Sequence, residues 1–207
     1  MTPRKNMDTD VRGQYEAYPY PPRDPADEAK RLITGSPSNI VEIEHYVFGR
    51  KLAADQPFRA LVAGGGTGDA TIMLASQLAA RGLMAEITHI DISGASLEIA
   101  RARAAARKLD SINFIQASLN DLTELGLEKF DYIDCCGVLH HLPEPAAGLH
   151  SLVAALRPKG GIGLMLYGRL GRTGVYEAQD LLRLIADDLP DAERVETARA
   201  LLDDLPP

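Results

Sequence analysis

FRALVAGGGTGD, residues 58–69, joins an apolar run to a glycine-rich turn. The apolar half, Phe58–Ala63, predicts a buried strand, and Asp69–Arg81 predicts a helix that Gly82 closes. Glycines between a strand and a helix let the backbone turn tightly and let a ligand approach the main chain without a Cβ in the way. The stretch therefore predicts a strand–loop–helix unit with a ligand-binding loop.

Short apolar runs alternate with helical patterns after this unit. Further strands are expected at Ala85–Asp91, Ile112–Gln116, Asp131–Cys136 and Ile162–Tyr167, and helices at Gly94–Lys108 and Pro145–Leu156. Strands that alternate with helices of this length form parallel βαβ units. We therefore expect an α/β fold with a Rossmann-like, doubly wound, mostly parallel sheet in the strand order 3-2-1-4-5, which has a switch point beside the first strand.

Composition separates the flanking regions from this α/β domain. Residues 1–37, rich in Pro, Tyr and charge, predict an ordered arm whose segment YEAYPYPP, residues 15–22, is not helical because of its prolines. Residues 38–54 predict a helix with Ser38 as its N-cap, so that the domain extends over residues 38–168. The C-terminal segment, residues 169–207, predicts two amphipathic helices, Val175–Asp188 and Asp191–Asp204, and no strand.

Charge and cysteine usage exclude several classes of protein. The 29 acidic residues outnumber the 22 basic ones, which disfavours nucleic acid as a partner because its binding relies on Lys and Arg. No apolar run approaches the ~20 residues of a membrane span, and the polar N-terminus lacks a signal peptide. Cys135 and Cys136 are adjacent and cannot link distant parts of the fold, so we expect a cytoplasmic protein. His45, His89 and His150 offer no metal-ligand spacing, so we expect no metal.

The glycine loop does not match the phosphate-binding patterns. The dinucleotide fingerprint needs glycine at positions one, three and six, and position six is Asp69 counted from Gly64 or Thr71 counted from Gly66. Asp69 would also repel a pyrophosphate. The pattern G-x-G-x-G, with Gly68 as its third glycine, suits a ligand that has a carboxylate, an amino group and an adenosine but no phosphate.

Asp91 is the second element of the predicted site. It ends the second predicted strand about 20 residues beyond the loop, where an acid pairs with ribose hydroxyls in nucleotide-binding folds. An acid there can also serve as a favourable charge at a helix N-terminus. Given the loop upstream, we expect the ribose role.

These features combine with two later segments, FDYIDCCGVLHHLPEP at residues 130–145 and LRPKGG at residues 156–161. Together they resemble the class I S-adenosylmethionine-dependent methyltransferases over about residues 57–168, in the family's order and spacing. The Tyr-Pro segment and YGRLGR, residues 167–172, are similar to a bacterial subgroup of these enzymes. The resemblance implies methyl transfer from S-adenosylmethionine to a small-molecule or protein acceptor.

The resemblance also implies roles for individual residues. The loop Gly64, Gly65, Gly66, Thr67 and Gly68 would line the methionine moiety of the cofactor, Asp91 would hold its ribose, and Ile92 would pack on its adenine. Ser118, followed by Leu119, falls where the family often has an acid that touches the adenine amine. Cys136, Gly137 and His140 would lie near the transferred methyl group.

Three departures from the family pattern bear on these roles. Val62 stands where the family commonly has an acid, and Ser118 replaces the adenine-side acid; both changes would weaken cofactor contacts without excluding binding. The hairpin of strands 6 and 7 is missing after residues 161–167, GIGLMLY. That fifth strand would then be an exposed apolar edge, which soluble proteins avoid. We expect first that the chain is truncated. Otherwise, we expect the edge of this strand to be covered by a partner, such as a second copy, or by the terminal helices.

The chemistry leaves some roles open. Methyl transfer from a sulfonium is an in-line displacement that depends on positioning and needs no metal. His140 or His141 is a candidate base, because His titrates near neutrality; the alternative is that His140 shapes the pocket and His141 packs locally. An aromatic face attracts a sulfonium, so we expect Tyr15 or Tyr20 to close over the cofactor.

Two other functions stay open. One is an NAD(P)-dependent oxidoreductase, which the missing third glycine of the fingerprint disfavours. The other is a non-catalytic cofactor-binding or interaction module, which Val62, Ser118 and the missing hairpin favour. The acceptor itself cannot be identified, because fold-level analogy does not specify substrates.

Overall fold

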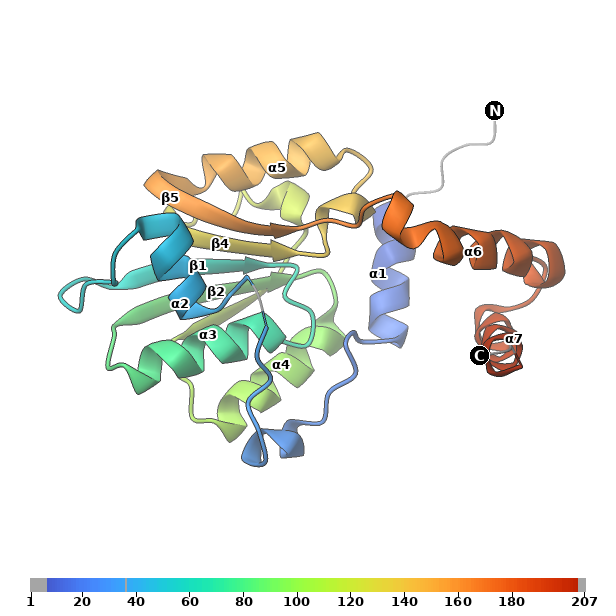
Figure 1. Cartoon of the computed structure of the whole chain (residues 1–207), viewed down its shortest axis with the longest axis horizontal. Coiled ribbons are helices and arrows are strands. Elements are labelled where there is room, and N and C mark those ends of the chain that lie inside the picture. Colours follow the sequence, from blue (N-terminus) through green and yellow to red (C-terminus); the bar gives the residue numbers. More distant parts are fainter. Residues whose placement is uncertain (1–6, 36, 205–207) are drawn as a thin grey trace. The chain divides into compact units, whose positions relative to one another are not determined.

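A five-stranded parallel sheet organises the computed structural model, which describes residues 7–35 and 37–204 (Figure 1). The strands lie in the order β3-β2-β1-β4-β5, and every neighbouring pair is parallel. Their bounds are β1 Phe58–Ala63, β2 Ala85–Asp91, β3 Ile112–Gln116, β4 Phe130–Cys136 and β5 Leu156–Met165. This confirms the predicted Rossmann-like fold with its switch point between β1 and β4.

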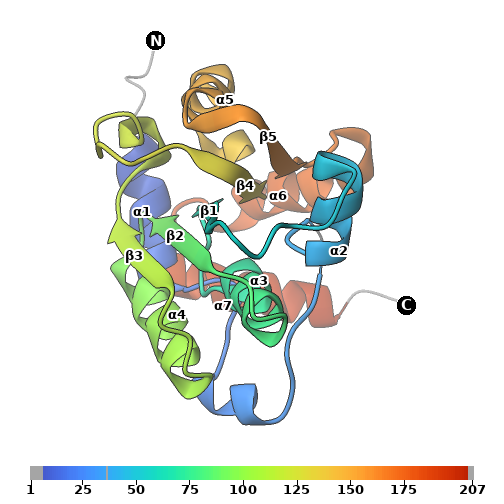
Figure 2. The same ribbon diagram turned by 90° about the vertical axis from the view of Figure 1, so that its left-hand side faces the viewer.

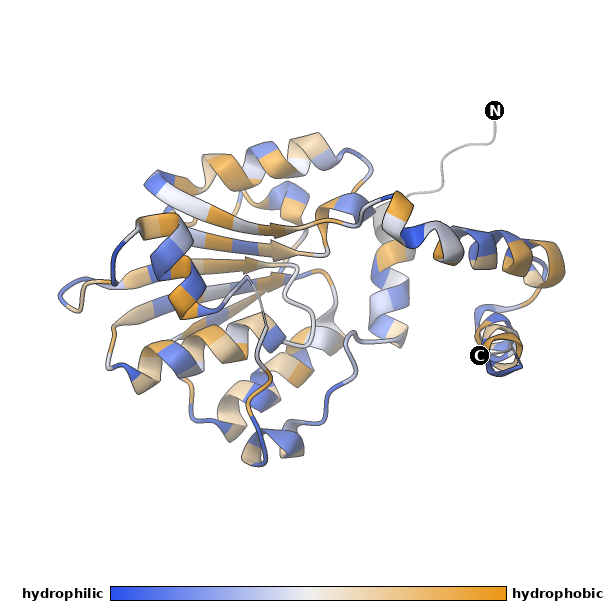
Figure 3. Ribbon diagram, viewed as in Figure 1, coloured by the Kyte–Doolittle hydropathy of each residue, from blue (hydrophilic) through white to orange (hydrophobic). Residues whose placement is uncertain are grey.

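Helices cover both faces of the sheet. The helices α3 (Asp69–Ala80) and α4 (Gly94–Ala106) lie on one side, and α5 (Pro145–Ala154) lies on the other (Figure 2). Alternate residues of β1 supply the two cores: Ala60 and Val62 pack with α3, whereas Leu61 and Ala63 pack with α5. Hydropathy follows this burial, with apolar residues concentrated on the strands (Figure 3). The period of two along a strand thus builds the two layers of the core.

The arm contains more helix than the sequence indicates. Helix α1 (Met7–Ala17) extends into the segment for which no helix was expected, and the 3-10 helix η1 (Pro25–Ala29) follows. The expectation was wrong for Tyr15–Ala17, because a proline restricts only the residue before it, here Tyr18. Residues 1–6 of the predicted arm lie outside the described part of the chain.

The predicted leading helix is short and irregular. It consists of α2 (Ile40–Glu42) and the π-helical η2 (Ile43–Phe48), which ends at Gly49 with φ +60°. The predicted N-cap was wrong: Asn39 caps the helix by accepting from the N–H of Val41 at 2.9 Å. Ser38 instead donates its hydroxyl to Asp134 on β4, a tertiary contact that the local pattern does not reveal.

Strand β5 begins six residues before its predicted start at Ile162. Leu156 pairs with Phe130 and Gly161 pairs with Tyr132, so a large bulge absorbs the residues that were expected to form a turn. β5 is an edge strand on which Leu164 and Met165 are exposed, and in the described part of the chain no strand follows it.

A second compact unit over the described residues 167–204 contains the short 3-10 helix η5 (Leu170–Arg172) and two helices, α6 (Thr173–Ala186) and α7 (Asp191–Asp203). They correspond to the two predicted C-terminal helices. Within this unit the guanidinium of Arg172 lies 3.9 Å from the centre of the Tyr167 ring. None of the described helices has the length and apolar character that crossing a membrane requires.

Candidate functional site

The glycine loop between β1 and α3 requires its glycines. Gly64, Gly66 and Gly68 have φ of +68°, +53° and +100°, a region that other residues rarely adopt. A Cβ at Gly64 would also lie 2.4 Å from a methyl group of Val138. A Cβ at Gly65 would lie 2.4 Å from the ring of His89. The G-x-G-x-G spacing is therefore a requirement of backbone conformation as well as of close packing.

Asp91, at the end of β2, lies beside this loop. Its carboxylate accepts hydrogen bonds from the N–H of Gly66 at 2.7 Å and of Ser93 at 2.9 Å. Burial raises the pKa of Asp91, and the hydrogen bonds from these two N–H groups partly oppose that shift. Ile92 follows and is half-buried. The ends of β1 and β2 thus meet at one carboxylate.

The segment after β4 approaches the same loop. Gly137 turns with φ +78°, and Val138 then packs against Gly64. His140 and His141 lie in the 3-10 helix η4 (Leu139–His141), with ring centroids 4.3 Å apart. Cys136 is half-buried at the end of β4, where burial raises the pKa of its thiol. The residues expected near the methyl group therefore lie at the carboxyl edge of the sheet, next to the glycine loop.

Ser118 and Leu119, which were expected near the adenine, have other contacts in this structure. Ser118 caps the 3-10 helix η3 (Leu119–Asp121), and its hydroxyl accepts from the N–H of Asn120 at 3.2 Å. Leu119 is buried in the core on the α5 side of the sheet. Their cofactor roles stay predictions.

Asp134 is a buried polar residue near the site that sequence reasoning missed. It pairs in register with Val62, accepts a hydrogen bond from Ser38 Oγ at 2.5 Å, and has a pKa that burial raises to about 6. On the other side of Val62, His89 pairs in register and bonds to Thr71 Oγ1 at 2.8 Å, and burial lowers its pKa to about 3. The available signal was an acid in the middle of the predicted strand Asp131–Cys136.

The arm lies on the ends of three strands. After β2, Ser93 Oγ donates to the carbonyl of Tyr15 at 3.0 Å. Glu16 accepts from the first N–H groups of α4, those of Ala95 at 3.0 Å and Gly94 at 2.8 Å, and these bonds lower its pKa. After β4, the hydroxyl of Tyr15 lies 3.5 Å from His141 Nε2.

At the glycine loop the arm uses its main chain. The carbonyl of Tyr20 accepts from the N–H of Thr67 at 3.3 Å, and the carbonyl of Pro21 accepts from its hydroxyl at 2.7 Å. The ring of Tyr20 points outward, with 62% of the residue exposed. Of the two tyrosines proposed to cover a cofactor, Tyr15 is thus the one whose ring lies among site residues.

Comparison with known proteins identifies relatives of this site. Residues 61–162 match the family model described as a methyltransferase domain. An uncharacterized protein of Synechococcus is 37% identical over 182 residues, which are 84% of this chain and 40% of that protein. The ubiquinone biosynthesis O-methyltransferase of Alkalilimnicola ehrlichii is 29% identical over 116 residues, 55% of this chain and 46% of that enzyme.

A solved structure agrees in fold. The crystal structure of the DszA carbon methyltransferase has a TM-score of 0.52 and 22% identity, and the match covers 60% of this chain and 33% of that one. The chain thus spans less than half the length of these two curated relatives.

Proposed function

The chain contains a class I methyltransferase domain, and on that premise we propose that it transfers a methyl group from S-adenosylmethionine to a small-molecule or protein acceptor. One observation carries the proposal: the glycine loop, Asp91 and the segment after β4 meet at the carboxyl edge of the sheet. Ligands of doubly wound folds bind at this edge, beside the switch point. The proposal covers the activity of this domain and leaves the acceptor open.

The residues present fit S-adenosylmethionine. The positive-φ glycines give a loop without side chains, against which a methionine moiety can lie. Asp91 offers carboxylate lone pairs to two ribose hydroxyls, and each of its oxygens can accept more than the one backbone bond it now accepts. Tyr15 supplies an aromatic face for a sulfonium. We therefore assign cofactor binding to Gly64–Gly68, Asp91, Ile92 and Tyr15.

In the proposed reaction the chain contributes position rather than activation. Bound S-adenosylmethionine supplies a methyl group already activated by a sulfonium. The glycine loop and Asp91 hold the cofactor, while Cys136, Gly137 and His140 form the wall on the acceptor side. Alignment of acceptor and methyl group in this way contributes up to ~7–11 kcal/mol in favourable cases. If the acceptor carries a proton, His140 or His141 takes it.

The test is calorimetric titration of the chain with S-adenosylmethionine, with NAD and ATP as controls for the oxidoreductase and phosphate-binding alternatives. We expect binding of S-adenosylmethionine alone. Gly66→Ala should abolish it, because the new Cβ would lie 2.4 Å from the carbonyl of Tyr20 at a φ of +53°. The matched control is Gly168→Ala, whose Cβ meets no atom within 4 Å. A folded chain that binds NAD instead would overturn the proposal.

A second function, cofactor binding without transfer, is favoured by Val62. This residue is buried in the apolar core on the α3 side of the sheet, where the family pattern has an acid. The two functions differ in one measurement, the formation of S-adenosylhomocysteine during an acceptor screen. Binding without product from any acceptor class favours the second.

A further inference from the structure

Thr67 is the residue of the glycine loop on which the arm converges. It is fully buried, and all three of its polar groups are bonded. Its N–H and hydroxyl donate to the carbonyls of Tyr20 and Pro21, at 3.3 and 2.7 Å. Its carbonyl accepts from Nη1 of Arg103 on α4 at 2.8 Å. The loop and the arm are thus joined at a single residue.

Arg103 joins three elements. Only 1% of its side chain is exposed, an unusual burial for an arginine. Besides Thr67, it binds Asp69 at the start of α3 at 2.7 Å and Glu28 in η1 at 2.6 Å. The side chain of Glu28 is only 3% exposed, so this ion pair is shielded from solvent. Arg103 therefore connects the glycine loop, the helix after it and the arm.

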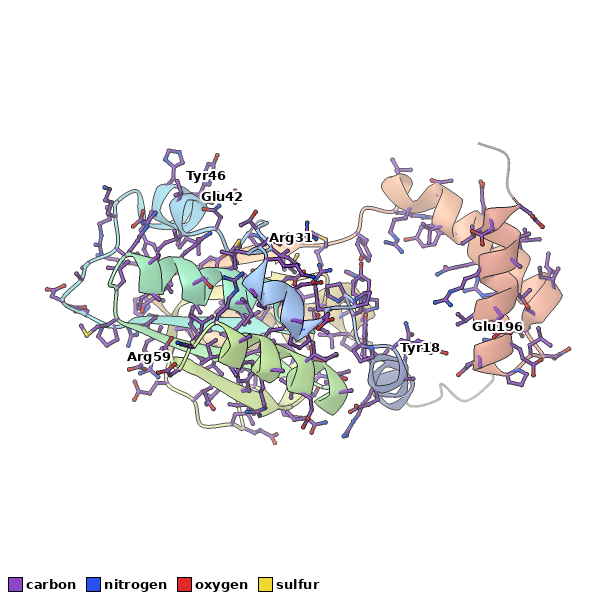
Figure 4. The ribbon with its side chains drawn as sticks, turned by 90° about the horizontal axis from the view of Figure 1, so that it is seen from below. Tyr18, Arg31, Glu42, Tyr46, Arg59 and Glu196 are labelled. Carbon is purple, nitrogen blue, oxygen red and sulfur yellow. The ribbon has the colours of Figure 1, made fainter. Side chains whose placement is uncertain are left out.

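Two further arginines complete this network. Arg23 of the arm makes two bonds to the carboxylate of Asp69, at 2.9 and 2.6 Å. Burial alone would raise the pKa of Asp69, but the bonds from Arg23 and Arg103 hold it below its usual value. Arg107 binds Glu28 and donates to the carbonyl of Arg31 at 2.6 Å, where the chain leaves η1 beside α4 (Figure 4).

The network has a consequence for the loop. If the arm lifted away, Arg103 would lose Glu28 and Asp69 would lose Arg23, and buried charges without partners are costly. Thr67 would lose the acceptors of its N–H and hydroxyl. The loop conformation seen here therefore depends on a docked arm, and a docked arm depends on Arg103.

Building on the proposed function, we propose that Arg103 is a positioning residue that couples docking of the arm, residues 15–31, to cofactor binding at the glycine loop. The same arm covers the ends of β1, β2 and β4, so a cofactor between them lies beneath it. The cofactor enters when the arm is lifted, and docking then encloses it. Such coupling is reciprocal. The factor by which docking of the arm increases the affinity for the cofactor is therefore the factor by which bound cofactor increases the equilibrium constant for docking.

The experiment is hydrogen–deuterium exchange of the full chain with and without S-adenosylhomocysteine, together with the calorimetric Kd of that compound. In the wild type, the ligand should slow exchange in residues 15–31. Arg103→Met and Glu28→Gln should each speed exchange of the arm without ligand and weaken binding at least about tenfold, within the usual range of coupling. The double variant should be little worse than Arg103→Met alone, because that variant already removes the Arg103–Glu28 pair.

The matched control is Arg101→Met. Arg101 lies on the same helix but is exposed, and it donates to the carbonyl of Phe114 at 2.9 Å. It should leave both measurements unchanged. Exchange in β1 and β4 reports whether each variant is folded, and Arg23→Met, which removes a partly exposed member, replaces Arg103→Met if that variant unfolds.

The outcomes separate the two proposals. Two results would overturn the coupling and leave the methyltransferase proposal intact. One is an unchanged affinity for S-adenosylhomocysteine in folded Arg103→Met and Glu28→Gln. The other is a rate of exchange in the arm that is the same with and without ligand. A wild type that binds no S-adenosylhomocysteine overturns the proposed function, and with it the coupling, even if Arg103 still holds the arm in the absence of ligand.

Discussion

The carboxylate of Asp91 accepts a hydrogen bond from the N–H of Gly66 at 2.7 Å. The residue that ends β2 thereby fixes the middle of the loop that follows β1. Two predicted elements of the site, a glycine loop and an acid about 20 residues later, are in direct contact. Asp91 therefore holds the loop, and in the proposed function it also binds the ribose.

Removal of this acid should therefore cost more than one ligand contact. Asp91→Ala takes away a charged acceptor of two backbone N–H groups, and bonds to charged groups contribute about 1.5–3 kcal/mol each. We expect the affinity for S-adenosylmethionine to fall by about tenfold to 100-fold in calorimetry. Asp110→Ala, at an exposed position, is the control. Wild-type affinity in Asp91→Ala would contradict the assignment of Asp91 to the cofactor site.

The two tyrosines of the arm should differ in effect. Tyr15→Ala removes a ring that lies beside His141, and an aromatic face over a cation contributes about 0.5–2 kcal/mol, a factor of about 2–30 in Kd. Tyr20→Ala keeps the main-chain carbonyl that binds Thr67 and loses only an outward ring, so its Kd should stay near that of the wild type. Equal losses from both would contradict the assignment to Tyr15.

A pair of glycines can separate close packing from backbone strain. Gly64 and Gly126 have similar φ, +68° and +61°, but only at Gly64 would a Cβ meet another group, the Val138 methyl at 2.4 Å. Gly126→Ala should destabilise by about 1–2 kcal/mol from conformation alone. Gly64→Ala should cost about 1–3 kcal/mol more, from overpacking. Urea unfolding measures both, and equal losses would mean that Val138 moves aside freely.

Asp134 should make stability depend on pH. Its pKa is raised from 3.8 to about 6 in the folded state, so the folded chain holds the proton more tightly than the unfolded chain. Its contribution is therefore most favourable below about pH 4 and is lost as the pH rises to about 6, by roughly 3 kcal/mol. Asp134→Asn should remove this dependence and leave the chain more stable at pH 7.

The measurement for Asp134 is the difference in unfolding free energy between wild type and variant across pH 4–8. Taking the difference cancels the other titrating groups, and Asp110→Asn controls for an exposed carboxylate. A difference that is flat with pH would show that Ser38 compensates the buried charge fully.

Local sequence patterns predicted the elements around the site but not the contacts between distant ones. β1, β2 and β3 have their predicted bounds, because apolar runs limited by glycine or polar residues mark buried parallel strands. The bulge in β5 was missed because it depends on pairing with β4. The prediction of Ser38 as an N-cap was wrong because its partner, Asp134, lies 96 residues away in the sequence.

The arm shows the same limit. Glu28 and Arg103 look like ordinary surface charges in a linear reading, since nothing in the local sequence marks either side chain as buried. Their burial follows only when η1 packs on α4. Charged residues almost never bury without a partner, and here the two partners lie 75 residues apart. Glycine-loop residues could be predicted because their constraint is local, whereas the network that holds them could not.

Tyr20 and Pro21 hold Thr67 through main-chain carbonyls. These main-chain hydrogen bonds do not depend on the side chains of Tyr18 and Tyr20. The two residues are 48% and 62% exposed, so their side chains can be replaced without loss of packing in the core. Evolution, or a combinatorial library, can therefore change these two side chains while the main-chain bonds to Thr67 are kept.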